Sequence, residues 1–251
     1  MLKVIISGCN GKMGRVLAQQ IEKQEDMEMV AGIDPNTEAC SHPFPVYPSP
    51  SSCKVKADVL IDFSHHSALP GILNFCIEHK TPLVLATTGF SEEDMQRIKE
   101  ASKSIPIFQS ANMSVGINVM MDLVQKAAQA FGERYDIEII EKHHNQKIDA
   151  PSGTAFMLAN AINKVFDEQK EFVYGRHGKS EKRQPKDLGI HAIRGGTIVG
   201  EHTVIFAGED EILEIRHTAL SKNIFAIGAI EAAKFISRHE KGLYNMNDLL
   251  R

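Results

Sequence analysis

Cysteine is scarce in this sequence, and its pattern argues against cross-linking or zinc binding. Only four of the 251 residues are cysteines, all lie in the first third of the chain, and no two form a C-x-x-C pair (Cys9, Cys40, Cys53 and Cys76). A disulfide framework or a structural zinc site would need paired or closely spaced cysteines. We therefore expect a reduced, cytoplasmic protein.

Long apolar runs and an excess of one charge sign are also missing. No stretch approaches the roughly 20 apolar residues that span a bilayer, and the first apolar run is too short for a secretory signal. The formal net charge of −4 gives no general attraction to nucleic acid or to an anionic membrane. A small anionic ligand is not excluded, because local charge can oppose the net sign.

Short apolar, β-branched runs alternate with helix-like segments over the first 131 residues. The runs lie at 2–6, 27–34, 57–64, 81–90 and 105–111, and a proline- and serine-rich segment at 41–52 is expected to be a loop. Ser91 and Asp94 are spaced as in a capping box, which indicates a helix start. This alternation predicts an α/β fold with a Rossmann-type, doubly wound parallel sheet.

The pattern changes after residue 131 and indicates a second domain. Segments at 136–144, 190–206 and 211–220 alternate or are separated by glycine-bearing turns, which predicts a mixed, largely antiparallel sheet in an α+β domain. The polar, net-basic segment 174–189 is either a solvated connection or a ligand-contacting loop. Residues 224–244 are expected to be helical again.

A glycine motif follows the first predicted strand. Gly8, Gly11 and Gly14 form G-x-x-G-x-x-G before a helix, and such glycines allow a pyrophosphate to approach the backbone at the helix N-terminus. An ordinary strand-to-helix turn could use the same residues. However, the second strand ends in Asp34, 20 residues after Gly14, where an acid can hydrogen-bond an adenosine ribose. Together these positions predict a dinucleotide site.

Asp34 also bears on the choice of cofactor. Its carboxylate would repel a 2′-phosphate, and Pro35 offers no cation there, although Lys12 in the glycine turn could supply one. The cofactor is therefore expected to be NADH or NADPH, and the sequence favours NADH.

The segment 141–155 concentrates groups that donate protons or bind anions. His143 and His144 are adjacent, and Lys147 follows three residues after the second histidine. The period of two on a strand puts Glu141 and His143 on one face and His144 on the other. A single histidine is more often structural, but Lys147 and a polar helix start follow at once, which favours a functional site.

The polar helix start lies at Ser152-Gly153-Thr154, directly after Pro151. Proline is favoured in the first turn of a helix, and free N–H groups at a helix N-terminus can bind a carboxylate. The same residues could simply cap the helix. With His-His-x-x-Lys beside it, the helix start suits a dicarboxylate substrate. The histidine pairs at 65–66 and 143–144 lack the spacing or cysteine partners of a zinc site, so no metal is expected.

Several motifs occur in the order found in the dihydrodipicolinate reductase family, and the resemblance covers essentially the whole chain. They are GCNGKMGR, ATTGF, SANMSVGINVM, IEIIEKHHNQKIDAPSGTA, GIHAIRGGTIVGEHTV and GLYNMNDLL. The resemblance implies NAD(P)H-dependent reduction of 4-hydroxy-tetrahydrodipicolinate to tetrahydrodipicolinate in diaminopimelate and lysine biosynthesis. It also implies a dinucleotide-binding domain of residues 1–113 completed by 223–251, a substrate-binding and oligomerisation domain of residues 114–222, and usually a homotetramer built through the mixed sheet.

Matching the motifs residue by residue assigns candidate roles. His143 and Lys147 match the family's catalytic residues, with Lys147 as the proton donor. His144, Gly153 and Thr154 match substrate-carboxylate positions, and Ser152 joins them from the helix start. The cofactor positions are Gly8, Cys9, Asn10, Gly11, Lys12, Met13, Asp34, Ala86, Thr87, Thr88, Ser110, Ala111, Asn112 and Met113. Ala86, Thr197 and Lys222 depart from the residues common in the family (Gly, Asp and Arg), so fine positioning there can differ.

Two other functions use some of the same features. A related Rossmann dehydrogenase could act on another amino or keto dicarboxylate. A non-catalytic, NAD(P)-sensing module would bind the cofactor without turnover, but this interpretation leaves Lys147 and the Ser-Gly-Thr helix start unexplained.

Overall fold

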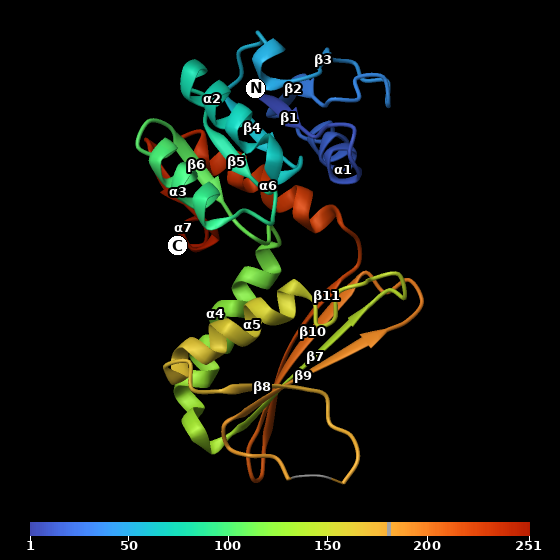
Figure 1. The fold of residues 1–251 in the computed structure, drawn as a ribbon, viewed down its shortest axis with the longest axis vertical. Coiled ribbons are helices and arrows are strands. Elements are labelled where there is room, and N and C mark those ends of the chain that lie inside the picture. Colours follow the sequence, from blue (N-terminus) through green and yellow to red (C-terminus); the bar gives the residue numbers. More distant parts are fainter. Residues whose placement is uncertain (180–181) are drawn as a thin grey trace. The chain divides into compact units, whose positions relative to one another are not determined.

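The structure is a computed structural model that describes residues 1–179 and 182–251. The chain forms two compact units (Figure 1). The first contains Met1–Ser114 and Lys222–Arg251, and the second contains Val115–Ser221. The second unit is thus inserted into the sequence of the first, and each unit has its own sheet.

The first unit is built on a seven-stranded sheet with the order β12-β6-β5-β4-β1-β2-β3. Every pairing in it is parallel. The strands are β1 (Leu2–Ser7), β2 (Met27–Ile33), β3 (Val46–Tyr47), β4 (Val59–Asp62), β5 (Leu83–Leu85), β6 (Pro106–Gln109) and β12 (Gly242–Tyr244).

Helices cover both faces of this sheet. On one side, α1 (Lys12–Ile21) and α6 (Asn223–Ile236) pack with Val4 and Ile6 of β1 in one core cluster. On the other, α2 (Leu69–His79) and α3 (Glu92–Ala101) pack with Ile5 in a second cluster. Successive residues of β1 therefore enter different cores, as a strand buried on both faces requires. The predicted doubly wound parallel sheet is confirmed.

Two short elements of this unit differ from the sequence prediction. Residues 224–244 were expected to be wholly helical, but α6 ends at Ile236, and β12 then pairs in parallel with β6. The predicted loop at 41–52 contains β3 and a short 3₁₀ turn, Pro50–Ser52. The helix α7 (Met246–Leu249) ends the unit. Strands of two or three residues are too short to show a period, so only their partners identify them.

The second unit has a five-stranded mixed sheet with the order β11-β10-β7-β9-β8. The pairs β10–β11 and β10–β7 are antiparallel, whereas β7–β9 and β8–β9 are parallel. The predicted mixed sheet is confirmed, although β8 was not predicted. The strands are β7 (Asp136–His143), β8 (Glu171–Tyr174), β9 (Asp187–Arg194), β10 (Gly200–Ala207) and β11 (Ile212–Ala219).

Helices α4 (Val115–Phe131) and α5 (Gly153–Asn163) share one core with this sheet. Val124 and Leu158 of the two helices pack with Ile137 and Ile139, which are both buried on β7. Short 3₁₀ turns follow the helices at Gly132–Arg134 and Lys164–Phe166. Buried and more exposed residues alternate along the whole of β7. One face of β7 is therefore committed to the core, and this alternation positions the candidate site below.

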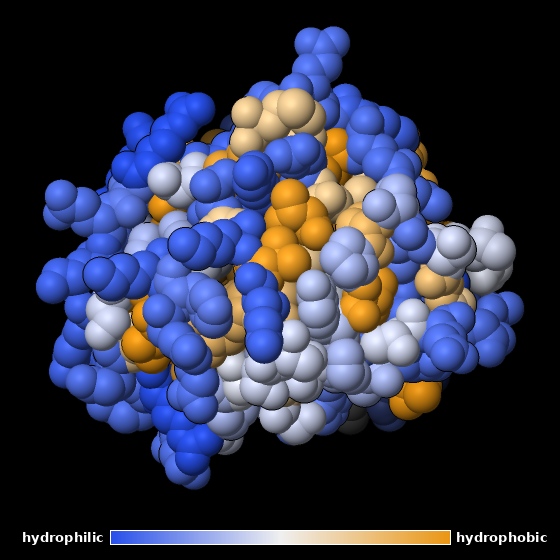
Figure 2. Space-filling view, turned by 90° about the horizontal axis from the view of Figure 1, so that it is seen from above, coloured by the Kyte–Doolittle hydropathy of each residue, from blue (hydrophilic) through white to orange (hydrophobic). Residues whose placement is uncertain are grey.

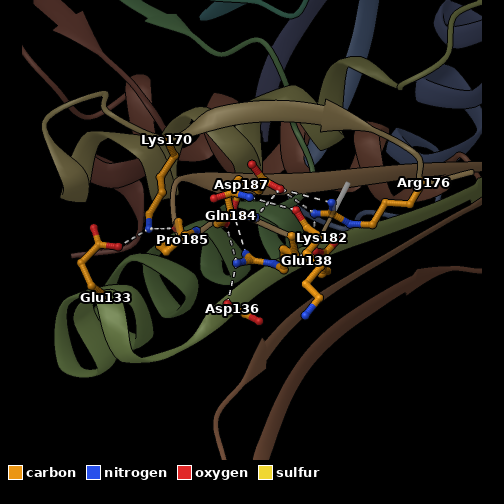
Figure 3. Close-up of polar contacts among 10 residues, drawn as sticks. Glu133, Asp136, Glu138, Lys170, Arg176, Lys182, Gln184, Pro185 and Asp187 are labelled. Atoms are coloured by element: carbon orange, nitrogen blue, oxygen red, sulfur yellow. Dashed lines mark hydrogen bonds and ion pairs between the residues drawn. The ribbon is translucent and has the colours of Figure 1, made fainter. Parts of the chain in front are cut away.

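The basic segment 174–189 is attached to the sheet by ion pairs. Arg176 donates to Glu138 and Asp187 over 3.2 Å each, and the Nε of Arg183 donates to Glu138 Oε1 over 3.1 Å (Figure 3). Both arginines are thus engaged by carboxylates of their own unit, which favours a connecting loop over a ligand-contacting one. Residues 180 and 181 of this segment lie outside the described residues.

The surface gives no sign of a bilayer-spanning helix. In the described ranges 1–179 and 182–251, every helix is too short or too polar to cross a membrane. The face drawn in Figure 2 is mostly hydrophilic, with hydrophobic side chains in a small central patch and at scattered positions.

We expect Gly228→Ala to destabilise the first unit by about 2–3 kcal/mol, the cost of forcing extra volume into a packed core. A Cβ at Gly228 on α6 would lie 1.7 Å from the backbone oxygen of Met113. The control is Gly71→Ala on α2, where the nearest atom would be 3.5 Å away. That change should be neutral or stabilise by up to about 1 kcal/mol through helix propensity. Urea unfolding compares the two variants, and equal stabilities would contradict the close approach of α6.

Candidate active site

The order of strands in the first unit creates a switch point beside β1. The chain leaves β1 for β2 on one side, whereas β4, β5 and β6 extend the sheet on the other. In open parallel sheets, ligands bind outside the carboxyl ends of the strands at such a point. The predicted cofactor residues follow the carboxyl ends of β1, β2, β5 and β6, and therefore lie along one edge of this sheet.

The glycine turn after β1 depends on the absence of side chains. Gly8 has φ +77°, and a Cβ there would lie 2.7 Å from the backbone oxygen of Phe63. A Cβ at Gly14 would lie 2.0 Å from the oxygen of Gly8. Gly11 is the N-cap of α1, and among the described residues no side chain caps that end of the helix. The turn thus offers uncapped backbone N–H groups and the positive end of a helix dipole.

Asp34 lies directly after β2 and is tied to the glycine turn. Its Oδ2 accepts from the backbone N–H of Asn10 over 3.0 Å, and its Oδ1 accepts from that of Asn36 over 3.0 Å. The side chain of Asn10 donates to the backbone oxygen of Asn36 and contacts His42 Nε2 at 2.7 Å. The structure therefore brings together Asp34 and the turn, as predicted, and adds Asn36 and His42, which the sequence did not single out.

The other predicted cofactor residues divide into buried and accessible ones. The hydroxyl of Thr87 donates to Asp62 over 2.7 Å, and Ser110 donates to the backbone oxygen of Asn112 over 2.8 Å. Burial raises the pKa of Asp62, a carboxyl that the sequence prediction missed. Cys9 and Met113 are also buried. The exposed or partly exposed residues are Lys12, Met13, Ala86, Thr88 and Ala111.

Burial makes Cys9 a packing residue rather than a reactive one. Its side chain is fully buried in the core beneath the glycine turn. Burial, together with the charge of Asp34, raises the pKa of Cys9 to about 11. A ligand at the turn would therefore meet the backbone of Cys9.

In the second unit, β7 carries two polar residues on its core face. Glu141 is 0% exposed and His143 is 9% exposed, on the same side as Ile137 and Ile139. His144 follows the strand and is only partly buried. The predicted alternation is confirmed. A carboxylate on the buried face of a strand requires partners, because burying an unpaired charge is costly.

Glu141 has a partner for each of its oxygens. Arg194 at the end of β9 forms a bidentate pair with it, 2.8 Å to each carboxylate oxygen. His143 Nδ1 lies 2.6 Å from Oε2, and the N–H of Ser152 donates to Oε1 over 2.9 Å. Burial alone would raise the pKa of Glu141, but the hydrogen bonds from Arg194 and His143 hold it below its usual value.

His143 is surrounded by groups that disfavour its protonation, apart from Glu141. Burial lowers the pKa of His143, and the charges of Lys147 and Arg194 act in the same direction. The ring centroid of His202 on β10 lies 5.2 Å from that of His143. Burial, with the charge of His143, lowers the pKa of His202 to about 4. Both rings are therefore neutral near neutral pH.

Lys147 lies in the turn that follows β7. Its ammonium lies 2.8 Å from Asp149 Oδ1, and its side chain is 22% exposed. Arg194 donates to the backbone oxygen of Asp149 over 2.6 Å, and the N–H of Asn145 donates to Gly196 over 3.2 Å. The turn carrying Lys147 is thus fixed to the end of β9, while the amine keeps partial access to solvent.

The start of α5 combines a cap with an open position. Ser152 is the N-cap: its hydroxyl accepts from the N–H of Ala155 over 3.2 Å and lies 3.0 Å from His202 Nε2. The capping interpretation is therefore correct for Ser152. Gly153 is exposed, and among the described residues no atom other than those of its chain neighbours and the backbone of its own helix lies within 4 Å of its Cβ position. Gly153 and Thr154 are the first two residues of α5, at the positive end of its helix dipole.

The sequence prediction missed Glu141, Arg194, His202 and Asp149 as site residues. The signal for Glu141 was present, because the period of two put it on the face of His143. Arg194 lies 53 residues later, and only the parallel pairing of β7 with β9 places it directly across from His143. Among the described residues, no group of three or more His, Cys, Asp or Glu side chains could hold a metal ion.

Comparisons with known proteins agree along the whole chain. The family models for "Dihydrodipicolinate reductase, N-terminus" and "Dihydrodipicolinate reductase, C-terminus" match residues 2–113 and 116–250. A 4-hydroxy-tetrahydrodipicolinate reductase of Caldanaerobacter subterraneus is 54% identical over 251 residues, covering 100% of this chain and 99% of the relative. A protein of the same name from Clostridium tetani is 49% identical, with coverages of 100% and 97%.

Solved structures give the same answer for the fold. A dipicolinate-bound dihydrodipicolinate reductase from a Paenisporosarcina species has a TM-score of 0.83 at 27% identity, covering 98% of this chain and 99% of that one. A probable dehydrogenase from Thermotoga maritima has a TM-score of 0.63 at 12% identity, with coverages of 99% and 92%, and shares the fold alone.

Proposed function

The chain belongs to the dihydrodipicolinate reductase family, and from that premise we propose how its two sites reduce 4-hydroxy-tetrahydrodipicolinate to tetrahydrodipicolinate. It is a nicotinamide-dependent oxidoreductase of diaminopimelate and lysine biosynthesis that acts on a cyclic imine dicarboxylate. The observation that carries the proposal is the cluster on β7 and α5. There, Lys147 and His143 lie in the same unit as a helix start that can bind a carboxylate.

The cofactor site fits a dinucleotide. A Cβ at Gly8 or Gly14 would clash with the backbone of Phe63 or Gly8, so this tight turn needs glycine there, and the α1 N-terminus at Gly11 can receive a pyrophosphate. Asp34, fixed by two backbone N–H groups, keeps further lone pairs for ribose hydroxyls. Met13, Thr88, Ala111 and the backbone of Cys9 would contact the rest of the cofactor. When bound, a reduced nicotinamide supplies a hydride.

NADH is the preferred form in this proposal. The carboxylate of Asp34 would repel a 2′-phosphate on the ribose. Lys12 is exposed and is the first residue of α1, the helix end proposed to receive the pyrophosphate, so we assign its charge to that group.

The substrate is expected to bind through its carboxylates. The first N–H groups of α5, at Gly153 and Thr154, would bind one carboxylate together with the helix dipole. His144 and Lys147 would orient the other polar groups of the ring. The N–H of Ser152 already donates to Glu141, so we assign Ser152 to capping and positioning rather than to direct contact.

Lys147 supplies the proton in this mechanism. The hydroxyl of 4-hydroxy-tetrahydrodipicolinate leaves as water together with a ring hydrogen, which gives the dehydrated, electron-poor ring. Hydride transfer to a carbon of that ring then leaves negative charge, which one proton from a nearby acid must neutralise. The ammonium of Lys147 can donate that proton and stabilise the developing charge. The charges of Lys147 and Arg194 each lower the pKa of His143, so both cations act on the His143 imidazole. The neutral imidazole of His143 then accepts a hydrogen bond beside the reacting ring of the substrate and orients its donor.

A coupled assay tests the function. The substrate is generated from aspartate semialdehyde and pyruvate with the upstream synthase, and the absorbance of NADH or NADPH is followed in parallel reactions. We expect oxidation with both, and a higher kcat/KM with NADH. A much higher kcat/KM with NADPH would contradict the cofactor preference alone. Nucleotide binding without oxidation would favour a sensing module and overturn the function.

We also propose a homotetramer and a cytoplasmic location. The face of the mixed sheet opposite α4 and α5 carries partly or wholly exposed apolar residues between charged ones, such as Ile140, Ile205 and Ile212. A second copy of the sheet would cover them. Membership of a biosynthetic reductase family supports the location.

A further inference from the structure

The carboxylate of Glu141 is a junction between three elements of the second unit. It accepts four hydrogen bonds, two to each oxygen. Oε1 accepts from Ser152 and Arg194, and Oε2 accepts from His143 and Arg194. Glu141 is 0% exposed. The last residue of β7, the end of β9 and the N-cap of α5 are therefore held by one buried group.

The ionised state of Glu141 decides where the hydrogen of His143 lies. An ionised carboxylate can only accept hydrogen bonds, so His143 Nδ1, 2.6 Å from Oε2, must carry the hydrogen. Arg194, on a neighbouring strand, keeps Glu141 ionised despite its burial. A neutral imidazole with a hydrogen on Nδ1 has a lone pair on Nε2.

Neighbouring groups favour this neutral ring. Besides Glu141, the titratable or charged groups that act on His143 are Lys147, Arg194 and His202. Two are cations, and burial holds His202 in its neutral form near neutral pH. The Nε2 atom of His143 lies beside Gly200, where a Cβ would be only 3.1 Å away. A glycine at this position avoids a side chain against Nε2.

We propose that Glu141 is a positioning residue that keeps the hydrogen of His143 on Nδ1 and so leaves Nε2 as a hydrogen-bond acceptor. Through Ser152, the same carboxylate fixes the start of α5 relative to that ring. The proton consumed in the reaction then comes from Lys147 and not from His143. This proposal rests on the proposed function for the identity of the substrate.

The chain contains a matched control on the same strand. Glu138 lies three residues before Glu141 on β7, on the opposite face of the sheet. It also contacts a histidine, with His191 Nε2 at 2.8 Å. It accepts as well from Arg183, and from Arg176 as Figure 3 shows. Like Glu141 it pairs with a histidine and with arginine, but its side chain is 21% exposed and it touches neither His143 nor the start of α5.

Glu141→Gln tests the tautomer with little change of shape. The amide oxygen can still accept from Ser152, whereas the amide nitrogen would face Nδ1 of His143 and donate to it. The hydrogen of His143 should therefore move to Nε2. Glu138→Gln should leave it on Nδ1.

The measurement is ¹⁵N NMR of the two proteins and the wild type with labelled histidine, with His143→Gln used to assign the signal. We expect the Nδ1–H form in the wild type and in Glu138→Gln, and the Nε2–H form in Glu141→Gln. Turnover of Glu141→Gln should fall by about 10²-fold or more, because a catalytic histidine in the wrong tautomer cannot serve. Binding of pyridine-2,6-dicarboxylate should change only a few-fold.

The outcomes separate this proposal from the function. An Nε2–H tautomer in the wild type would overturn the proposal even if the assay shows turnover, and this arm needs no variant to fold. An unchanged turnover in Glu141→Gln would overturn it as well. Absence of turnover in the wild type would refute the function, while the NMR arm would still decide the tautomer.

Discussion

Replacing Lys147 with methionine is expected to lower kcat by about 10²- to 10⁴-fold, the usual contribution of a general acid. The ammonium is the only proton donor that our mechanism assigns to the reacting ring. Methionine keeps most of the length and apolar character of the side chain but removes both the charge and the proton. NADH binding should stay within a few-fold of the wild type, because Lys147 lies in the second unit and the glycine turn lies in the first. Steady-state kinetics and an NADH titration measure the two effects.

Lys142→Met is the matched control for this prediction. Lys142 is on β7, five residues before Lys147, and it too pairs with a carboxylate, 3.3 Å from Glu201, but its side chain is on the face opposite His143. Its loss should change kcat less than about threefold, as expected for a partly exposed ion pair. Added ethylammonium should restore part of the activity of Lys147→Ala. Equal losses in the Lys147 and Lys142 variants would show that a general loss of charge, not proton donation, explains the effect.

The fold could be predicted from the sequence where local patterns match the final structure. Each main strand of the first unit is an apolar, β-branched run, and the Ser91–Asp94 capping box marks the observed start of α3. The strands β8 and β12 were missed for a physical reason. They have four and three residues, and they become strands only because β9 and β6 are already in place to pair with them.

The candidate site was predictable in its local part and not in its long-range part. The spacing of His143, Lys147 and the α5 start lies within one segment, so the sequence displays it directly. The partners Arg194 and His202 come from β9 and β10, and the register of the mixed sheet alone brings them to Glu141 and Ser152. A rule that would have found Arg194 is available: a carboxylate on the buried face of a strand predicts a cation on a neighbouring strand.

Arg194→Met is expected to destabilise the second unit by about 3–5 kcal/mol at pH 8, the cost of leaving a buried charge without its partner. The Arg194 side chain is 19% exposed and the Glu141 side chain is 0% exposed, so solvent cannot replace the guanidinium. Urea unfolding followed by circular dichroism, with hydrogen exchange of the β7 amides, measures the loss. The control is Arg176→Met, whose side chain is 35% exposed. Since Arg183 still pairs with Glu138 there, the loss should be about 1 kcal/mol or less.

The pH dependence of this loss has a defined sign. In the wild type, the pKa of Glu141 is lowered in the folded state. Its stabilising contribution is therefore present above its unfolded pKa of about 4.3 and is lost as the pH falls through the folded value. Without Arg194, burial raises the pKa of Glu141 instead, so the variant is destabilised most when this carboxyl is ionised. The difference in the free energy of unfolding between variant and wild type should therefore narrow from pH 8 to pH 5. A difference that widens would contradict the ion pair.

A double variant separates stability from positioning. Replacing both partners, as Arg194→Met with Glu141→Leu, removes the buried charge altogether, and such replacements are often neutral or stabilising. We expect the double variant to recover most of the lost stability. Its turnover should remain at least about 10²-fold below wild type, because leucine cannot hold the hydrogen of His143 on Nδ1. Recovery of both stability and turnover would mean that the pair serves folding alone. Recovery of stability alone would show that the buried pair is retained for the orientation of His143 and of the α5 start.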